Sequence, residues 1–250
     1  MRWFCFCFAL LSLLRAEGAP LPVPSGTPVP LAPGPLINVA PPFSEWLMTT
    51  QAGPVESATG APTSAPSGSN NNAKPLPPLR KLVVKTGPVR YEVTEQPSGV
   101  KIEQWFTNGM VATIVPGAAA PSVAASGASQ SSYSQQTNDH SKSDFDGFDW
   151  ISKKNYIGAV QLGGGTCIVF HTGSEAGVAP PPGGAAPLGR TAYITSDTRL
   201  PVILQNEDNL TTYEFRTPPN SVLPVPAAVQ TAISAVVQRQ QSAAAQPAGP

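Results

Sequence analysis

Proline is distributed very unevenly along this chain, and that distribution limits where a packed core can form. Fifteen of its 30 prolines lie in residues 20–78, a stretch that holds only three charged residues. Proline has no backbone N–H, and a Pro-, Ala- and Ser-rich segment buries too little apolar area to offset its chain entropy. We therefore expect residues 20–78 to form a disordered linker. Within it, residues 43–48 (FSEWLM) could dock as a short helix capped by Ser44.

Residues 79–115 carry the strongest β pattern of the chain. Apolar and polar residues alternate from residue 79 onward, which is the period of a half-buried strand. Asn108 and Gly109 lie between two such runs and supply the two positive-φ positions of a type I′ hairpin. The pattern predicts a meander of three or four antiparallel strands.

Two low-complexity stretches interrupt the strand pattern of residues 79–216, which we expect to form one β domain. Residues 117–143 and 173–189 are rich in small residues or proline, and we expect both to be disordered insertions. About 100 residues in about eight strands remain, enough for one modest core. Because these strands do not alternate with helices, the chain is predicted to be mainly β, with a single antiparallel curved sheet or partial barrel.

Residues 217–250 are expected to form a proline-rich linker followed by a short amphipathic helix. Pro226 stands at a first helical position, where proline is tolerated, and an apolar stripe follows at helical spacing. The stripe is short and β-branched, so we expect the helix to dock on the sheet or to fray in solvent. Trp105 is expected to face the side of the sheet opposite to that of Val100, Ile102 and Gln104. On that side, this helix or residues 43–48 would shelter it. The stripe consists of Val229, Ile233, Val236 and Val237.

The N-terminus has the organisation of a secretory signal peptide. Arg2 precedes an uncharged run over residues 3–14, and small residues at Ala16, Gly18 and Ala19 offer cleavage sites. The run is shorter than the roughly 20 apolar residues that a membrane-spanning helix needs. We therefore expect residues 1–19 to be removed, the mature protein to be secreted or periplasmic, and no transmembrane segment to remain.

Charge and cysteine content argue against two classes of protein. Fifteen acidic residues balance 15 basic ones, so no polyelectrolyte field favours nucleic acid. Signal cleavage would remove Cys5 and Cys7 and leave Cys167 alone, which excludes an intramolecular disulfide in the mature chain. We expect neither nucleic-acid binding nor a cystine-stapled fold.

The candidate catalytic and modification residues are few. Cys167 and His171 suggest a nucleophile and a base, but residues four apart on one strand are separated by about 13 Å, beyond hydrogen-bond reach. The three glycines at 163–165 precede no Lys-Ser or Lys-Thr pair and suggest a flexible hairpin tip. Asn209 begins an N-glycosylation sequon, which matters only in a eukaryotic secretory pathway. We predict no catalytic residue and no cofactor.

An acidic cluster surrounds Gly147 and resembles part of a calcium-binding loop. Aligning Gly147 with the sixth position of such a loop places Lys142 at the first position and Lys153 at the twelfth, where carboxylates are required. We therefore predict no metal site of this kind and favour an acidic turn anchored to the core by Phe145, Phe148 and Trp150. The cluster comprises Asp139, Asp144, Asp146 and Asp149.

Residues 193–202 (YITSDTRLPV) resemble a hairpin of the LolA and LolB families of bacterial envelope proteins. Those families combine an aromatic strand, an Asp-x-x-Thr-type turn and a return strand that begins with proline. The resemblance is centred on residues 191–215 and covers residues 156–215 at most. It implies an antiparallel sheet wrapped around an apolar ligand cavity.

Bulky apolar residues recur on the predicted strands of the second half, where a curved sheet could leave a ligand cavity. Our leading hypothesis is an exported non-enzymatic envelope or secreted protein whose sheet binds an apolar small molecule or an envelope protein. The alternatives are a secreted structural or scaffold protein with no ligand cavity, and a hydrolase with an unrecognised site. The candidate ligand-binding residues are Tyr156, Phe170, Tyr193, Tyr213 and Phe215.

Overall fold

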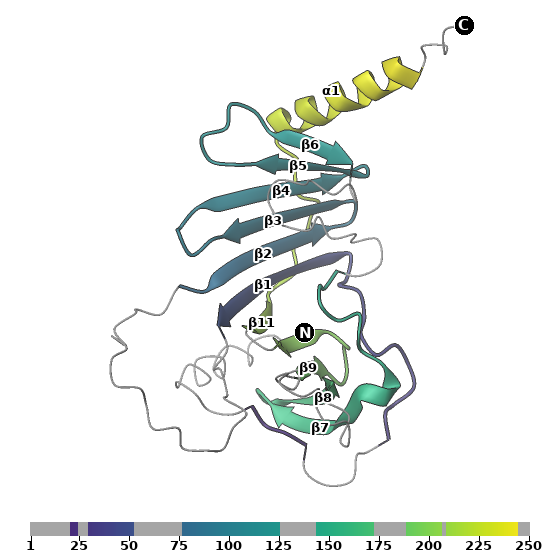
Figure 1. The fold of residues 1–250 in the computed structure, drawn as a ribbon. Helices are drawn as coiled ribbons and strands as arrows, with labels where there is room; N and C mark the ends of the chain where they lie inside the picture. Colours follow the sequence, from purple (N-terminus) through teal and green to yellow (C-terminus); the bar gives the residue numbers. More distant parts are fainter. Residues whose placement is uncertain are drawn as a thin grey trace, which may run out of the picture.

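The computed structural model of this chain is built on one open antiparallel sheet (Figure 1). It describes residues 21–24, 30–52, 77–125, 144–172, 189–206 and 209–244. Across these residues the sheet has 11 strands, in the order β6-β5-β4-β3-β2-β1-β11-β10-β9-β8-β7. The predicted signal peptide, residues 1–19, lies outside the described residues.

Two runs of consecutive strands make up the sheet. The first comprises β1 (Phe43–Ala52), β2 (Leu79–Thr86), β3 (Val89–Glu95), β4 (Lys101–Thr107), β5 (Met110–Ile114) and β6 (Ser122–Ala125). After a 3-10 turn, η1 (Lys153–Asn155), the second comprises β7 (Tyr156–Leu162), β8 (Gly165–Thr172), β9 (Arg190–Thr195), β10 (Pro201–Gln205) and β11 (Asn209–Phe215). The helix α1 (Ala227–Ala244) follows. The prediction of a mainly β chain with a single antiparallel sheet and a C-terminal helix is confirmed.

The expected number of about eight strands is wrong, because the described sheet has 11. Two of its strands, β1 and β6, fall within the segments 20–78 and 117–143 that were expected to be disordered. The composition of these segments predicted disorder, but a strand gains most of its stability from its neighbours in the sheet and not from its own sequence. The sheet is open, with β6 and β7 at its edges, and does not close into a barrel. Residues 53–76, 126–143 and 173–188 lie outside the described residues.

Residues 43–52 form the strand β1, and the expectation of a short helix at 43–48 is wrong. Ser44 and Trp46 are buried, while the alternate residues Glu45 and Leu47 are only partly buried, which is the two-residue period of a strand. β1 pairs with β2 on one side and with β11 on the other. It therefore joins the two runs of strands into one sheet.

The β4–β5 hairpin turns at the dipeptide that the sequence singled out. Asn108 and Gly109 have φ angles of 52° and 70°, and Thr107 pairs with Met110 across the turn. Both residues adopt the left-handed conformation that a two-residue type I′ turn requires. The prediction of this hairpin is confirmed.

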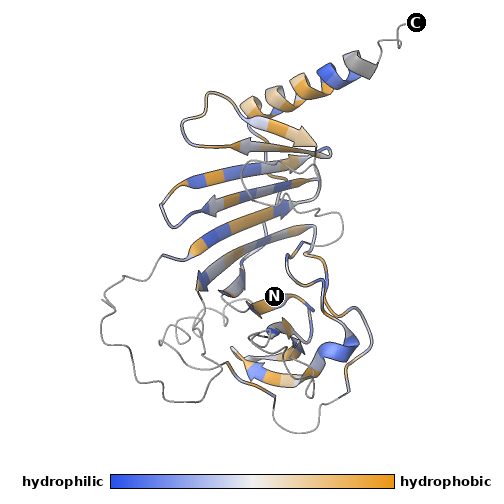
Figure 2. Ribbon diagram, viewed as in Figure 1, coloured by the Kyte–Doolittle hydropathy of each residue, from blue (hydrophilic) through white to orange (hydrophobic). Residues whose placement is uncertain are grey.

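Strand register assigns the buried aromatic residues to two opposite faces of the sheet. Trp46 lies opposite Phe215 on β11, and Tyr213 is two residues from Phe215, so all three share the face that we call the aromatic face. Tyr91 lies opposite Trp105 on the other face, which we call the helix face because α1 packs there. Figure 2 shows the alternation of hydrophobic and hydrophilic residues along these strands.

On the helix face, α1 covers the end of the sheet formed by β4, β5 and β6. Val229 and Ile233 of α1 pack in one cluster with Trp105, which confirms that the helix shelters Trp105. Beyond the helical turns that carry Val229 and Ile233, α1 projects past β6, and its far end is hydrophilic (Figures 1 and 2). In the described part of the chain, no helix has the combination of length and apolar composition needed to span a membrane.

Candidate functional site

Four of the five predicted ligand-binding residues lie on the aromatic face. Tyr156 and Phe170 are paired across β7 and β8, with ring centroids 5.9 Å apart. Tyr213 and Phe215 lie two residues apart on β11. All four belong to one apolar cluster with Trp46. The sheet thus brings together residues from both ends of the second run of strands.

Tyr193 is the exception, because it lies on the helix face. It is paired with Ile203 on β10 and Val169 on β8, and these residues form a separate cluster with Cys167. Its hydroxyl group donates a hydrogen bond of 3.0 Å to the carbonyl oxygen of Pro22. Burial raises the pKa of Tyr193 to about 12, with a smaller contribution from Cys167. The five predicted residues therefore do not form one site.

Phe145 and Phe148 cover the aromatic face between the predicted ligand-binding residues. The Phe145 ring lies 5.9 Å from that of Tyr213 and 6.0 Å from that of Phe215, measured between centroids. The Phe148 ring lies 5.7 Å from Tyr213. With 2% and 5% of their surface exposed, Phe145 and Phe148 are core residues. Their rings occupy space that an apolar ligand on this face would need.

The covering segment, residues 144–151, has neither helical nor strand structure. It is held in shape by two internal hydrogen bonds, from Trp150 Nε1 to the Gly147 carbonyl at 2.8 Å and from the Ile151 N–H to the Phe148 carbonyl at 3.1 Å. We call this segment the aromatic cover. Anchoring of the acidic turn by Phe145, Phe148 and Trp150, favoured from the sequence, is confirmed.

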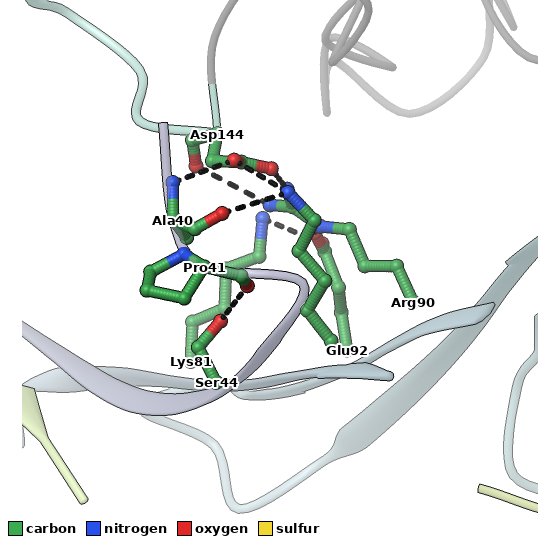
Figure 3. Close-up of polar contacts among 8 residues, drawn as sticks. Ala40, Pro41, Ser44, Lys81, Arg90, Glu92 and Asp144 are labelled. Carbon is green, nitrogen blue, oxygen red and sulfur yellow. Dashed lines mark hydrogen bonds and ion pairs between the residues drawn. The ribbon is translucent and has the colours of Figure 1, made fainter. Parts of the chain in front are cut away.

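Asp144 ties the aromatic cover to the sheet through a buried ion network (Figure 3). Its two carboxylate oxygens contact Arg90 Nη1 and Lys85 Nζ, each at 2.8 Å. The same carboxylate accepts a hydrogen bond of 2.9 Å from the N–H of Ala40. Lys85 also donates to the Ala40 carbonyl, at 3.1 Å. Asp144 therefore joins the cover, the segment before β1 and the sheet, and its oxygens are engaged by protein groups rather than available to a cation.

The network continues along the aromatic face to Glu92. The Glu92 carboxylate contacts Arg90 Nε and Lys81 Nζ, both at 2.6 Å, and its side chain is 1% exposed. The Arg90 guanidinium also lies 5.4 Å from the ring of Trp46, within cation–π range. Three cations surround two carboxylates, so the cluster carries a net positive charge. The sequence reasoning missed this network, although the alternation of Arg90 and Glu92 with Tyr91 placed both charges on one face.

Tyr213 is a buried member of the apolar cluster on the aromatic face. Burial raises its pKa above the ordinary value, and Asp146 adds to the shift. Tyr213 is therefore neutral at physiological pH. Its ring packs against both phenylalanines of the cover.

Among the residues that the structure describes, the others singled out in the sequence form no recognisable catalytic arrangement. Cys167 is buried in the apolar cluster of the helix face, and the ring of His171 contacts the Thr191 hydroxyl through Nδ1 at 3.0 Å. Asn209 is exposed at the start of β11. Asp139 lies outside the described residues. Within the described ranges, no group of three or more His, Cys, Asp or Glu side chains is placed to hold a metal ion.

Comparisons with known proteins find similar solved structures. No family model matches the sequence, and no curated protein matches it either. Among solved structures, a LolA superfamily protein from Nitrosomonas europaea is similar, with a TM-score of 0.31 and 10% sequence identity. The match covers 74% of this chain and 90% of that protein. The structural comparison thus returns the group that residues 191–215 resemble, at an identity and TM-score too low to carry any argument about function.

Proposed function

We propose that this chain is an exported, non-enzymatic binding protein whose aromatic face takes up an apolar ligand such as an acyl chain. The observation that carries the proposal is that a short irregular segment, and not a helix or strand, completes the core on this face. Phe145 and Phe148 occupy the place of the ligand, and the ligand enters when the aromatic cover moves away.

The chemistry of the aromatic face supports an apolar ligand. Trp46, Phe170 and Tyr213 form a continuous apolar surface beneath the cover. Exposing that surface to water would cost about 25 cal/mol per Å², so the face stays closed by the cover until a ligand replaces it. The positive charge of the neighbouring ion network suits a ligand with an anionic end.

Export follows from the proposed signal peptide, residues 1–19, and would place the protein in the periplasm or outside the cell. A ligand-binding role in that location needs no cofactor and no catalytic residue. The partner would be an apolar small molecule or an envelope protein that delivers one.

A secreted scaffold without a ligand is the second candidate. The tight packing of Phe145 and Phe148, with 2% and 5% of their surface exposed, favours it because the core is complete without any added molecule. In this case the sheet serves as a rigid docking module between proline-rich arms.

Binding of a fluorescent fatty-acid analogue to the mature chain distinguishes the two candidates. We expect saturable binding by the wild type and tighter binding by Phe148→Ala, which removes a ring that competes with the ligand. Phe43→Ala is the matched control, because Phe43 pairs with Thr86 on the helix face. In the wild type, ligand entry should also shift the emission of Trp150 on the cover.

If the chain is instead a scaffold without a ligand, we expect the opposite results. The wild type and Phe148→Ala would then both lack saturable binding while keeping their β-sheet circular dichroism. Trp150 emission would stay constant on addition of the fatty acid. That result would remove the ligand-binding proposal.

A further inference from the structure

Two arginines in the described part of the chain are buried, Arg90 and Arg199, each with 7% of its surface exposed. Arg90 contacts the carboxylates of Glu92 and Asp144. Arg199 contacts no carboxylate of the described residues: its Nη2 donates a long hydrogen bond of 3.4 Å to the Ala32 carbonyl, and its Nη1 has no partner. A buried charge is costly unless it is paired. Arg199 is therefore a buried cation for which the described chain supplies no anion.

The turn between β9 and β10 holds Arg199 in a strained conformation. Its φ angle of 58° lies in the left-handed region, which a residue with a Cβ atom seldom adopts. The Arg199 N–H donates to the Thr195 carbonyl at 3.1 Å, and the Arg199 carbonyl accepts from the Asn38 N–H at 2.9 Å. Strain of this kind persists where the surroundings fix the residue, and it gathers at functional sites.

The acidic residue closest in sequence does not neutralise Arg199. Asp197 is exposed, and its carboxylate accepts a hydrogen bond of 2.7 Å from the N–H of Thr198 within the same turn. The nearby carboxylate is thus used to shape the turn, and the guanidinium of Arg199 keeps a donor for another group.

Arg199 lies at the border of the aromatic face. Leu200, the next residue, packs against the aromatic cluster. Ile203 pairs with Thr212, so the chain leading back to Arg199 runs alongside the part of β11 that leads on to Phe215. Arg199 is therefore close to the apolar surface that we propose for the ligand, at its Phe215 end.

An irregular segment before β1, residues 30–38, lies over Arg199 and over this part of the aromatic face. Leu31, Leu36 and Ile37 pack against the aromatic cluster, and Asn38 binds the turn that carries Arg199. Residues 32–35 between them are exposed. Like the aromatic cover, this segment contains neither helix nor strand, so no regular element closes the route to Arg199.

The cations of the ion network are less suited to contact an incoming anion. Lys81 and Lys85 each contact a carboxylate, and Arg90 contacts two. An anion would have to compete with these carboxylates, whereas at Arg199 it would meet an unpaired Nη1. The planar guanidinium also matches the two oxygens of a carboxylate.

We propose that Arg199 binds the anionic end of the ligand, and that the ligand is an acyl chain with a free carboxylate. The carboxylate pairs with the guanidinium through Nη1, and the chain lies on the aromatic face. The ion network attracts the anion over a longer range, and Arg199 makes the direct contact. This inference rests on the proposed function and identifies the ligand as a fatty acid instead of a neutral lipid.

A fluorescent fatty acid and its methyl ester, carrying the same fluorophore, test the pairing by titration into the chain from residue 20 onward. The wild type should bind the acid at least about tenfold more tightly than the ester, because only the acid has a charge to pair with Arg199. Arg199→Gln should remove this preference by weakening the acid at least about tenfold, while its affinity for the ester stays within about twofold of the wild type.

Arg216→Gln is the matched control, because it removes the same charge from the residue that follows Phe215. Arg216 already lies near the carboxylates of Glu45 and Glu214, at 3.5 and 3.6 Å, and its side chain is 38% exposed. This variant should keep the preference for the acid. Millimolar sodium acetate should not displace the acid, since acetate has the carboxylate without the chain.

Stability without ligand separates a binding role of Arg199 from a structural one. Arg199→Gln removes an unpaired buried charge, so its urea midpoint should equal or exceed that of the wild type. Arg199→Asn repeats both measurements with a residue that adopts positive φ angles more readily. A lower urea midpoint in both variants would show that Arg199 serves the fold and would overturn the proposal.

The remaining outcomes distinguish this inference from the proposed function. Saturable binding of acid and ester with equal affinity, or an unchanged preference in Arg199→Gln, would overturn the role of Arg199 and leave an apolar ligand in place. Displacement of the acid by acetate would assign Arg199 to small free anions and overturn the acyl chain. Absence of saturable binding of either probe would overturn both proposals.

Discussion

Glu92 and Asp144 are carboxylates in an apolar surrounding, and each is paired with two cations. Glu92 contacts Lys81 and Arg90, and Asp144 contacts Arg90 and Lys85. A buried charge is tolerated only when its partners replace the lost hydration. At the scale of single residues, the network is therefore vulnerable to the loss of either carboxylate.

Asp144→Asn should destabilise the chain strongly, because it leaves Lys85 and Arg90 without their shared anion. Removing one partner of a buried ion pair costs about 3 kcal/mol or more. Urea unfolding of the chain from residue 20 onward measures the change. Glu45→Gln is the matched control: its pair with Arg216 is 3.5 Å long and partly exposed, so its loss should cost at most about 0.5 kcal/mol. Equal effects of the two substitutions would contradict the structural importance of the network.

Tyr193 should make stability depend on pH in the alkaline range. Burial raises its pKa from 10.0 to about 12, so the folded state retains a proton that the unfolded state releases. Its contribution to stability is complete below pH 10 and is lost as the pH rises from 10 towards 12. The free energy of unfolding should therefore fall across this window, and less steeply in Tyr193→Phe. An identical slope for the variant and the wild type would argue against a buried Tyr193. Tyr91 and Tyr213 shift in the same direction, so some decline remains in the variant.

At the scale of elements, α1 illustrates how tertiary contacts stabilise a weak helix. Its apolar stripe is short and β-branched, which makes an isolated helix marginal in water. Val229 and Ile233 are nevertheless buried against Trp105 and Met110. The first turns of α1 thus act as part of the core, while its far end extends beyond β6 (Figure 1).

Ending the chain after residue 225 should expose Trp105. The emission of Trp105 should shift to longer wavelength, because Val229 and Ile233 no longer exclude water from its ring. Fluorescence of the truncated chain measures the shift, and the Trp105→Phe version of the same chain should lack it. A shift that persists in Trp105→Phe would instead point to Trp46 or Trp150 and contradict the docking of α1 on Trp105.

On the scale of the whole molecule, the sheet depends on β1. Within the described sheet, β1 is the strand that pairs β2 with β11, so the two runs of strands meet only there. Segments before and after the sheet cover its faces: residues 144–151 cover the aromatic face, and residues 21–24 and 223–237 lie on the helix face. Because β1 and the covers each contact several strands, we expect the long open sheet to unfold as one cooperative unit.

Leu47→Pro should disrupt the whole molecule more than a proline at the sheet edge. Leu47 pairs with Leu82 and Glu214 on two sides, and proline there removes a backbone donor from a central strand. We expect a loss of about 3 kcal/mol or more, or the loss of a single cooperative transition. Val123→Pro on the edge strand β6 is the control and should cost less than half as much. Comparable thermal unfolding of the two variants would refute the central role of β1.

The sequence alone determined the local elements of this protein. Alternation of apolar and polar residues located most strands, Asn108-Gly109 located a hairpin, and the stripe of Val229 and Ile233 located the helix. These features depend on residues close together in the chain, whose spacing fixes which side chains share a face of one element. Within one strand the same spacing places Tyr213 and Phe215 on one face.

Only the tertiary structure decided which strands are neighbours and what covers each face. The helix face holds Tyr193 because the register of β9 against β8 is set by long-range pairing across residues 173–188 and not by the spacing within either strand. β1 forms because β2 and β11 flank it, although its surroundings in the sequence favour disorder. The aromatic cover reaches its place through Asp144, whose partners Lys85 and Arg90 lie more than 50 residues away. Non-local contacts of this kind give no periodic pattern in the sequence. They determine how the predicted strands assemble into this sheet.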